Sequence, residues 1–322
     1  MDTRECGCYD TRRERAPRAR PGDMQTKQTF QIRMMEITAV LCALVVLGIF
    51  PGCRKAAPGS GAEDDLAGMV RVAPATVKQG CGKAMICEWG EQGAQDARVP
   101  EFFIQETEVT NQEYADCVAA GKCRDNRAGD CFMPDELGRP VPGDAAHLPE
   151  GFAGADRPAA CVSWAMASDY CKWARKRLPA EVEWMAAAGA DREFPWGSRP
   201  APAGDKWNLF AQGRARLKNL ANAGQPVCCG PDGTDGFEGP APVGRFPDGR
   251  APSGALDMAG NVWEWTADCF KNDQNGRCAA RTIKGGSWES PVASLRIRAR
   301  TARAPNTRSA DIGFRCVLSK EN

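Results

Sequence analysis

The longest uninterrupted apolar stretch of the chain lies near its N-terminus, at residues 37–50 (ITAVLCALVVLGIF). Lys27 and Arg33 precede this stretch, and Pro51, Gly52 and Cys53 follow it. A basic segment, a short apolar segment and a small residue before a cleavage point are typical of a secretory signal. The stretch is 14 residues long, whereas a helix that spans a bilayer needs about 20. The pattern therefore predicts an exported protein.

The cysteine that follows Gly52 resembles the modified cysteine in the lipobox of bacterial lipoproteins, although Phe50 and Pro51 depart from the usual pattern. Lipidation of Cys53 would make this residue the new N-terminus and anchor the chain to a membrane. An ordinary cleaved signal or an uncleaved anchor are the alternatives. We expect a periplasmic or outer-membrane lipoprotein of the bacterial cell envelope.

The polar and apolar pattern divides the chain into three parts. Residues 1–53 hold an N-terminal extension and the signal. Residues 54–68 are polar and rich in Gly, Ala and Pro, which is typical of a flexible tether. Residues 69–322 have the composition of a folded domain.

Three segments of this domain carry a helical pattern. Residues 111–123 begin at Asn111 as a candidate N-cap and are stopped by Gly121. Residues 163–177 have Ser163 as N-cap and apolar residues at helical spacing. Residues 178–190 open with Pro179 near the first turn and close at Gly189.

Other segments are rich in β-branched and aromatic residues and predict strands: 99–110, 262–270, 281–288, 295–301 and 312–318. The connecting segments are rich in Gly, Pro and Asp, and βαβ alternation and internal repeats are absent. We therefore expect an α+β fold with short helices in an irregular β framework.

Composition narrows the function. Lys and Arg (42) nearly balance Asp and Glu (41), which excludes nucleic acid as the main partner because phosphate binding needs a basic excess. The chain has 16 cysteines and one histidine. This combination, without paired CxxC motifs, indicates disulfides rather than zinc sites, and hence an oxidising compartment.

Eight ordered segments resemble the formylglycine-generating enzyme (sulfatase-modifying factor) family. They are TEVTNQEYADCV (107–118), CVSWAMASDYCKWARKRLPAEVEW (161–184), FPWG (194–197), NLAN (219–222), DGFEGPAPVG (235–244), GALDMAGNVWEW (254–265), KGGSW (284–288) and RTARAPNTRSADIGFRC (300–316). The resemblance implies a variant of the C-type lectin fold with little regular secondary structure.

The resemblance also implies two structural calcium sites, whose oxygen donors suit calcium. The first would use the side chains of Asn219 and Asp235 and the carbonyls of Leu220 and Phe237. The second would use the side chains of Asp257 and Glu264 and the carbonyls of Gly260 and Val262. Without calcium, the same segments would be ordinary turns with a surface glutamate.

Two disulfides are expected with particular partners. The resemblance implies a bond between Cys171 and Cys316. Cys269 and Cys278 flank an Asn-Gly turn, which predicts a stapled hairpin. Cys81 and Cys87 could close a short local loop, and we expect the adjacent Cys228 and Cys229 to bond to different partners.

The family's enzymes bind copper(I) through two cysteines that follow the GGS motif. In this chain the corresponding positions are Ser290 and Leu295, and neither replaces a soft thiolate. We therefore expect no copper and no formylglycine generation. Related members hold iron through histidines, but this chain has only His147, so we expect no iron. GxSxG is also absent, which leaves a serine hydrolase without support.

The remaining candidate is a ligand groove with an aromatic floor and a cationic wall. It would use Trp263, Ser287, Trp288, Arg296, Arg298 and Arg303. Arg296, Arg298 and Arg300 alternate, as on one face of a strand. The alternative is a solvated, salt-bridged face. The groove would suit an acidic peptide, a glycan or a lipid headgroup.

These observations predict a non-catalytic binding or scaffold lipoprotein whose partner is an envelope protein, a peptide or a glycan. The alternative is an enzyme of the same family with unassigned chemistry.

Overall fold

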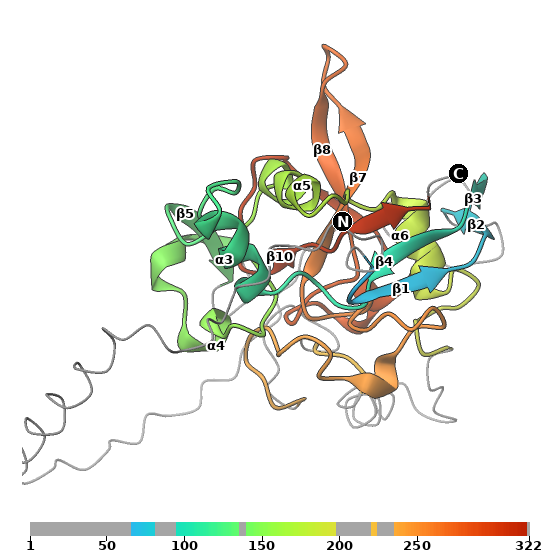
Figure 1. The fold of residues 1–322 in the computed structure, drawn as a ribbon, viewed down its shortest axis with the longest axis horizontal. Helices are drawn as coiled ribbons and strands as arrows, with labels where there is room; N and C mark the ends of the chain where they lie inside the picture. Colours follow the sequence, from blue (N-terminus) through green and yellow to red (C-terminus); the bar gives the residue numbers. More distant parts are fainter. Residues whose placement is uncertain (1–65, 81–94, 135–139, 198–219, 224–234, 321–322) are drawn as a thin grey trace, which may run out of the picture. The chain divides into compact units, whose positions relative to one another are not determined.

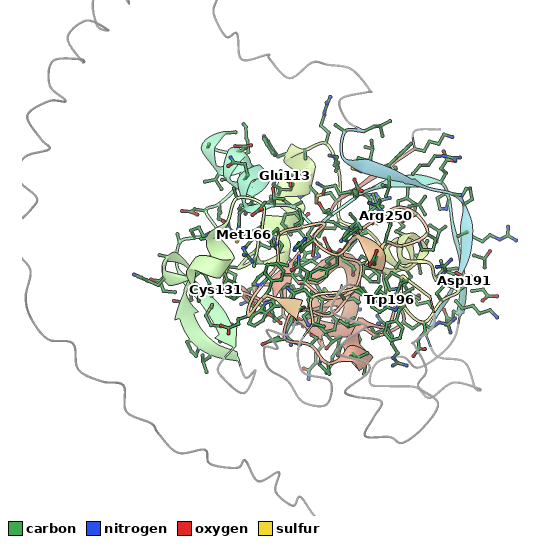
Figure 2. All side chains as sticks on the ribbon, turned by 90° about the horizontal axis from the view of Figure 1, so that it is seen from below. Glu113, Cys131, Met166, Asp191, Trp196 and Arg250 are labelled. Atoms are coloured by element: carbon green, nitrogen blue, oxygen red, sulfur yellow. A yellow bond between two sulfur atoms is a disulfide. The ribbon has the colours of Figure 1, made fainter. Side chains whose placement is uncertain are left out.

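The computed structural model describes residues 66–80, 95–134, 140–197, 220–223 and 235–320. All of them belong to one compact unit, Gly59–Asn322. Short helices are scattered among small sheets in this unit (Figure 1). Its interior is filled by side chains such as Met166, whereas Glu113 and Asp191 lie at the periphery (Figure 2).

The two ends of the domain meet in a three-stranded antiparallel sheet. Strand β4 (Phe102–Gln105) lies at its centre, between β1 (Met69–Val72) and β11 (Val317–Ser319). Ile104 of β4 is fully buried and is paired with a valine on each side. The first and last strands, each paired with β4, thereby close the domain.

A four-stranded sheet has the order β10-β7-β8-β9. Its strands are β7 (Trp263–Asn272), β8 (Cys278–Lys284), β9 (Thr301–Arg303) and β10 (Ile312–Gly313). Strands β7 and β8 extend beyond their neighbours as a hairpin that projects from the body of the fold (Figure 1).

Two ribbons of two strands complete the sheets. One pairs β2 (Ala75–Gln79) with β3 (Gln95–Val99), and the other pairs β5 (Asp130–Pro134) with β6 (Pro140–Asp144). Phe132 of β5 also forms a parallel bridge to Ser309. The β5–β6 ribbon is thereby fastened to the C-terminal segment.

The predicted helix at 111–123 is present as α3 (Asn111–Ala119), but its N-cap is Thr110 rather than Asn111. Thr110 and Glu113 form a capping box, in which each side chain satisfies a backbone N–H at the helix start. Asn111 instead donates to the carbonyls of Phe152 and Gly154.

The other two helices are shorter than predicted. Helix α5 (Trp164–Trp173) starts after Ser163, whose hydroxyl accepts from the Met166 N–H as expected. It ends before the left-handed Arg175 (φ 58°). Helix α6 (Glu181–Ala188) begins two residues after Pro179 and ends at Gly189, which has φ 94°. The short helix α4 (Glu150–Ala153) and three 3₁₀ turns, η2 (Ala145–His147), η4 (Pro247–Gly249) and η5 (Val292–Leu295), complete the described elements.

The predicted strand at 295–301 is wrong. This segment contains the end of η5 and a turn, and only Thr301 enters β9. Burial still alternates, because Leu295, Ile297 and Ala299 point into the core. The alternation of apolar residues and arginines in the sequence therefore predicts which side chains are buried, but it does not require a strand.

Four disulfides join described residues: Cys117–Cys123, Cys131–Cys161, Cys171–Cys316 and Cys269–Cys278. The last two are the pairs expected from sequence. Cys53, Cys81, Cys87, Cys228 and Cys229 lie outside the described residues. The expected α+β fold, with few short helices, is confirmed. No helix in the described ranges is long and apolar enough to cross a membrane.

Candidate functional site

Ser290 is buried beside Ser287 just beyond the end of β8. The Ser290 hydroxyl accepts a hydrogen bond from the Ser287 N–H at 3.0 Å, and the two hydroxyl oxygens are also 3.0 Å apart. Both serines are more than nine-tenths buried. The hydroxyl is thus part of a closed local network that stabilises the turn after Gly286.

Leu295 lies against the other side of the same turn. Its side chain is fully buried in an apolar cluster with Phe194, Ala221 and Ala259. A Cβ atom added to Gly286 would lie 2.6 Å from the Leu295 Cδ2 atom, so the leucine packs directly on the glycine backbone. The second position is therefore a packing site.

Together these positions present a hydrogen-bonded hydroxyl and an aliphatic side chain. Neither side chain offers the thiolate that copper(I) prefers. Cys161, Cys171 and Cys316 are all in disulfides. Over the part of the chain that the structure describes, no three His, Cys, Asp or Glu side chains are grouped as ligands of a metal ion.

The structure places the aromatic residues of the expected groove inside the fold. Trp263, Ser287 and Trp288 are 7%, 0% and 4% exposed. Trp288 packs edge-on against Phe152, with ring centroids 5.5 Å apart. These side chains do not form an open floor in this arrangement.

The arginines of the expected wall are separated. Arg296 donates to the Ala293 carbonyl, and Arg303 is exposed on β9. Arg300 pairs with the buried Glu181 at 2.9 Å and lies over the Phe270 ring. Arg298 is half-buried in the turn between η5 and β9. Arg300 accordingly stabilises the packing of α6 on the sheet.

A pocket of about 470 Å³ opens elsewhere, beside the β5–β6 ribbon. It brings together residues of the ribbon and of the segment that follows β9. Its lining is Asp130, Cys131, Phe132, Pro142, Asn306 and Arg308. Sequence reasoning missed this site because its two halves are more than 160 positions apart in the chain, and nothing in the motif at 300–316 marks Asn306 and Arg308 as neighbours of Phe132.

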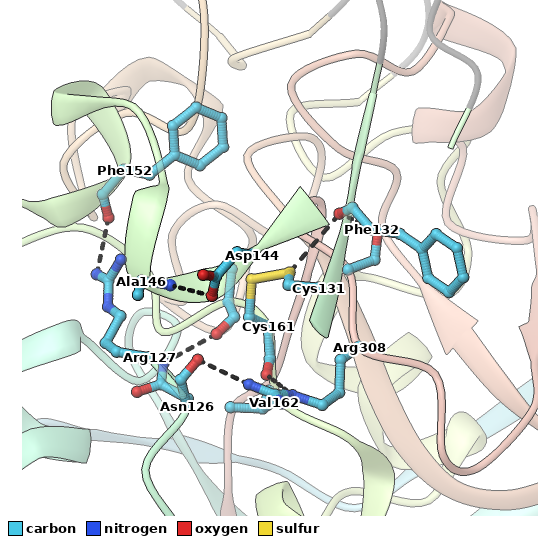
Figure 3. The surroundings of a disulfide bond; sticks show 12 residues. Asn126, Arg127, Cys131, Phe132, Asp144, Ala146, Phe152, Cys161, Val162 and Arg308 are labelled. Carbon is cyan, nitrogen blue, oxygen red and sulfur yellow. Dashed lines mark hydrogen bonds between the residues drawn. A yellow bond between two sulfur atoms is a disulfide. The ribbon is translucent and has the colours of Figure 1, made fainter. Parts of the chain in front are cut away.

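Arg308 lines this pocket, and its guanidinium is held in place close to the Cys131–Cys161 disulfide (Figure 3). Its guanidinium donates to the carbonyls of Cys161, Ala128 and Asn126 at 2.8, 2.7 and 2.9 Å. The neighbouring Cys131–Cys161 disulfide joins the ribbon to the segment before α5. The wall is therefore rigid before any ligand arrives.

Phe132 provides the apolar surface of the pocket and is 42% exposed. The Asp130 carboxylate and the Asn306 amide add exposed hydrogen-bonding groups. An exposed aromatic ring beside a few convergent polar groups is the usual composition of a ligand site.

Comparison with known proteins identifies the fold. Residues 55–320 match the family model described as the sulfatase-modifying factor enzyme 1-like domain. The chain belongs to the sulfatase-modifying factor family. It is 29% identical to the mouse formylglycine-generating enzyme over 77% of this chain and 74% of that protein. It is 32% identical to the Thermomonospora curvata formylglycine-generating enzyme over 71% of this chain and 86% of that protein.

The sulfatase-modifying factor family also contains proteins described as inactive. The mouse "inactive C-alpha-formylglycine-generating enzyme 2" is 30% identical over 71% of this chain and 79% of that protein. Among solved structures, PvdO from Pseudomonas aeruginosa has a TM-score of 0.59 and 24% identity, covering 78% of this chain and 94% of that one. That likeness supports the fold.

The first set of expected calcium ligands of the sulfatase-modifying factor fold is only partly described, since Asn219 lies outside the described residues. Asp235 accepts hydrogen bonds from the N–H groups of Ala223 and Phe237 at 3.2 and 2.9 Å. Leu220 approaches Gly249, whose missing Cβ leaves room for the Leu220 carbonyl. These contacts organise the loop around Asp235.

In the second set, Glu264 is held by a buried guanidinium. Arg315 donates from Nε and Nη2 to the two Glu264 carboxylate oxygens at 2.8 Å, and the Trp184 indole donates to one of them, also at 2.8 Å. Arg315 and Glu264 are both fully buried. Arg315, in the GFRC segment, was not among the residues singled out from sequence.

Asp257 lies beside Glu108, a second residue that sequence reasoning missed. Burial raises the pKa of the Glu108 carboxyl well above its usual range, and the nearby Asp257 adds to the effect. Burial also raises the pKa of Asp257 to about 6. Glu108 and Asp257 can form a hydrogen bond with each other only if one of the two carboxyls carries a proton. When both are ionised, neither oxygen of Glu108 has a hydrogen-bond partner.

These unpartnered oxygens fit a hard cation such as calcium. Of the expected second set, both Glu264 oxygens already accept from Arg315 or Trp184 and Asp257 accepts from the Gly244 N–H, so only Glu108 presents carboxylate oxygens without a hydrogen bond. The cation would neutralise buried carboxylates in the manner of a structural ion. A proton on Asp257 or Glu108 reduces the same repulsion, in keeping with the raised pKa of both carboxyls.

We predict that Glu108→Gln reduces the pH dependence of stability in calcium-free buffer. Unfolded Asp257 and Glu108 ionise near pH 4, whereas the folded cluster keeps protons to about pH 6 or above. Their stabilising contribution is therefore complete below pH 4 and is lost as pH rises through 6. Asp257 alone accounts for on the order of 3 kcal/mol.

Glutamine supplies a permanent N–H donor to Asp257 and carries no charge. The free energy of unfolding in urea, measured from pH 5 to pH 8, should fall less for Glu108→Gln than for the native chain. Glu238→Gln, which removes an exposed carboxylate, is the matched control. Parallel curves for all three proteins would show that the buried pair does not titrate in this range.

Proposed function

We propose that this chain is a non-catalytic member of the sulfatase-modifying factor family that binds a ligand at the cell envelope. The observation that carries this proposal is the pair Ser290 and Leu295. The Ser290 hydroxyl is hydrogen-bonded to Ser287, and the Leu295 side chain packs on Gly286. A family that already contains inactive relatives gives this interpretation a precedent.

The pocket beside the β5–β6 ribbon is the candidate ligand site. Phe132 can stack on a ring or an apolar side chain, and Asp130 and Asn306 can bind polar groups beside it. Asp130 and Arg308 carry opposite charges, so the pocket as a whole has no strong preference for an ion. An uncharged polar ligand, such as a glycan or a peptide segment, suits this lining.

The place of action rests on two features. The four disulfides require an oxidising compartment. The segment 37–53 provides an export signal that ends in a cysteine for lipidation. The domain would then lie next to a membrane on the tether 54–68.

The catalytic part of the proposal is tested with a peptide that contains CxPxR. Purified protein, incubated with this peptide, copper and oxygen, should give no product that is about 18 Da lighter, because no thiolate pair holds copper(I). The same preparation, analysed for metals, should contain calcium and neither copper nor iron. An active formylglycine-generating enzyme assayed alongside is the positive control.

Conversion of the peptide would refute the proposal directly. Tightly bound copper or iron would instead support the alternative, an enzyme of unassigned chemistry. Calcium alone, without conversion, is the expected result.

The binding part is tested by comparing two exposed aromatic residues. Phe132 is 42% exposed in the pocket and Trp173 is 39% exposed on α5. On glycan and peptide arrays, Phe132→Ala should lose at least tenfold in the signal of any ligand that the native chain binds. Trp173→Ala should retain that signal. Equal losses in the two variants, or none in Phe132→Ala, would place the ligand elsewhere.

A further inference from the structure

The Cys269–Cys278 disulfide differs from the other three described disulfides in its surroundings. Cys269 is exposed and Cys278 is half-buried, both on the projecting β7–β8 hairpin. In the other three, at least one cysteine of each pair is within 1% of complete burial, in the core. A thiol in solution can therefore reach a sulfur atom of the hairpin disulfide without opening the core.

The hairpin does not depend on this disulfide for its shape. At its base, Trp265 and Ile283 are paired and fully buried, and the Trp265 indole donates to the Val162 carbonyl at 2.9 Å. At its tip, the Asp273 carboxylate accepts from the N–H groups of Asn275 and Arg277. Both ends remain fixed when the bond between the cysteines is broken.

The reduced form also has acceptors in place. Asn272 Oδ1 lies 3.1 Å from the Cys269 sulfur, and the Ala280 carbonyl lies 3.1 Å from the Cys278 sulfur. Each oxygen would accept a hydrogen bond from the corresponding S–H group. The oxidised and reduced hairpins therefore need only small side-chain adjustments to interconvert.

We propose that Cys269–Cys278 is a thiol–disulfide exchange site, separate from the ligand pocket and independent of the proposed function. A thiolate attacks the more exposed Cys269 sulfur, forms a mixed disulfide with it and releases Cys278 as a thiolate, which takes up a proton. A second thiolate then attacks the mixed disulfide. It releases Cys269 and leaves the two attacking thiols joined as a disulfide.

The thiol can come from a small molecule or from a cysteine of a protein. Oxidised protein is incubated with reduced glutathione in one arm and with a reduced CxxC peptide in the other. Acid quenching, alkylation and tandem mass spectrometry then follow each cysteine. Cys269 and Cys278 should be alkylated at least tenfold faster than the cysteines of the other three described disulfides, with an unchanged near-UV circular dichroism spectrum.

Reaction in the glutathione arm indicates a small-molecule thiol, and reaction in the peptide arm alone indicates a protein thiol. Equal rates for another pair, or labelling only as the near-UV signal is lost, would overturn the proposal.

The direction of attack is tested with two matched variants. Cys278→Ser leaves the exposed Cys269, and Cys269→Ser leaves the half-buried Cys278. With oxidised glutathione, Cys278→Ser should form the mixed disulfide at least fivefold faster. Equal rates would refute attack at Cys269.

Discussion

Arg315→Met should lower the free energy of unfolding by about 3–5 kcal/mol, because it leaves the Glu264 carboxylate buried without its cation. The arginine makes more than this one pair. It also donates to the backbone carbonyls of Gln105, Glu106 and Leu256 at 2.9–3.1 Å. One side chain thus ties β7 to the end of β4 and to the loop before Asp257.

The measurement is urea unfolding followed by tryptophan fluorescence, with two comparison variants. Arg315→Lys keeps the charge but loses the fork that meets both carboxylate oxygens, and should be intermediate. The double variant Arg315→Met, Glu264→Gln removes the unpaired charge and should regain more than half of the loss. A loss below about 1 kcal/mol in Arg315→Met would show that water or another cation reaches Glu264.

The sequence predicted those parts of the fold that are specified locally. Ser163 and Gly189 mark the start of α5 and the end of α6 through hydrogen-bond and backbone preferences of single residues. The Thr110 cap was misassigned by one residue because Asn111 is an equally good cap in isolation. The Asn111 side chain is instead used in hydrogen bonds to the carbonyls of Phe152 and Gly154, which leaves Thr110 as the cap.

Features that depend on distant segments could not be predicted. The alternating arginines at 296–300 predict a strand. A strand forms only if a neighbouring strand supplies backbone hydrogen bonds, and the local sequence does not specify that neighbour. The pocket requires Phe132 and Arg308 to meet through the bridge at Ser309. Glu108 is one of three glutamates in the segment 99–110, and its unusual environment arises only when the fold buries it and brings Asp257 beside it.

Ser290 and Leu295 are located by a local motif, but their surroundings depend on distant segments. Counting from the GGS motif assigns the two positions to Ser290 and Leu295. The structure adds that the leucine is in contact with Gly286, so a cysteine there would leave unfilled space beside Ala221 and Ala259. Replacing both residues by cysteine would therefore weaken the packing of the core and lower stability, in addition to introducing two thiols.

Removal of the Cys171–Cys316 disulfide should have the other large effect on stability. The bond joins α5 to the residue before β11 and closes a loop of 145 residues. Chain entropy alone gives a loss of about 5 kcal/mol for a loop of this length. Both sulfurs are fully buried within the main core, beside Trp265 and Phe314.

The double variant Cys171→Ala, Cys316→Ala is compared with Cys269→Ala, Cys278→Ala, which opens a loop of only nine residues. The same entropy relation gives about 2.6 kcal/mol for the shorter loop, so the core variant should lose about twice as much in urea unfolding. The difference has a structural reason as well as an entropic one. Cys171–Cys316 fixes the closing strand β11 against a helix from the middle of the chain, whereas the hairpin already has its own ladder and turn. If the hairpin variant proved the less stable of the two, the three-stranded sheet β1-β4-β11 would have to close the domain without covalent help.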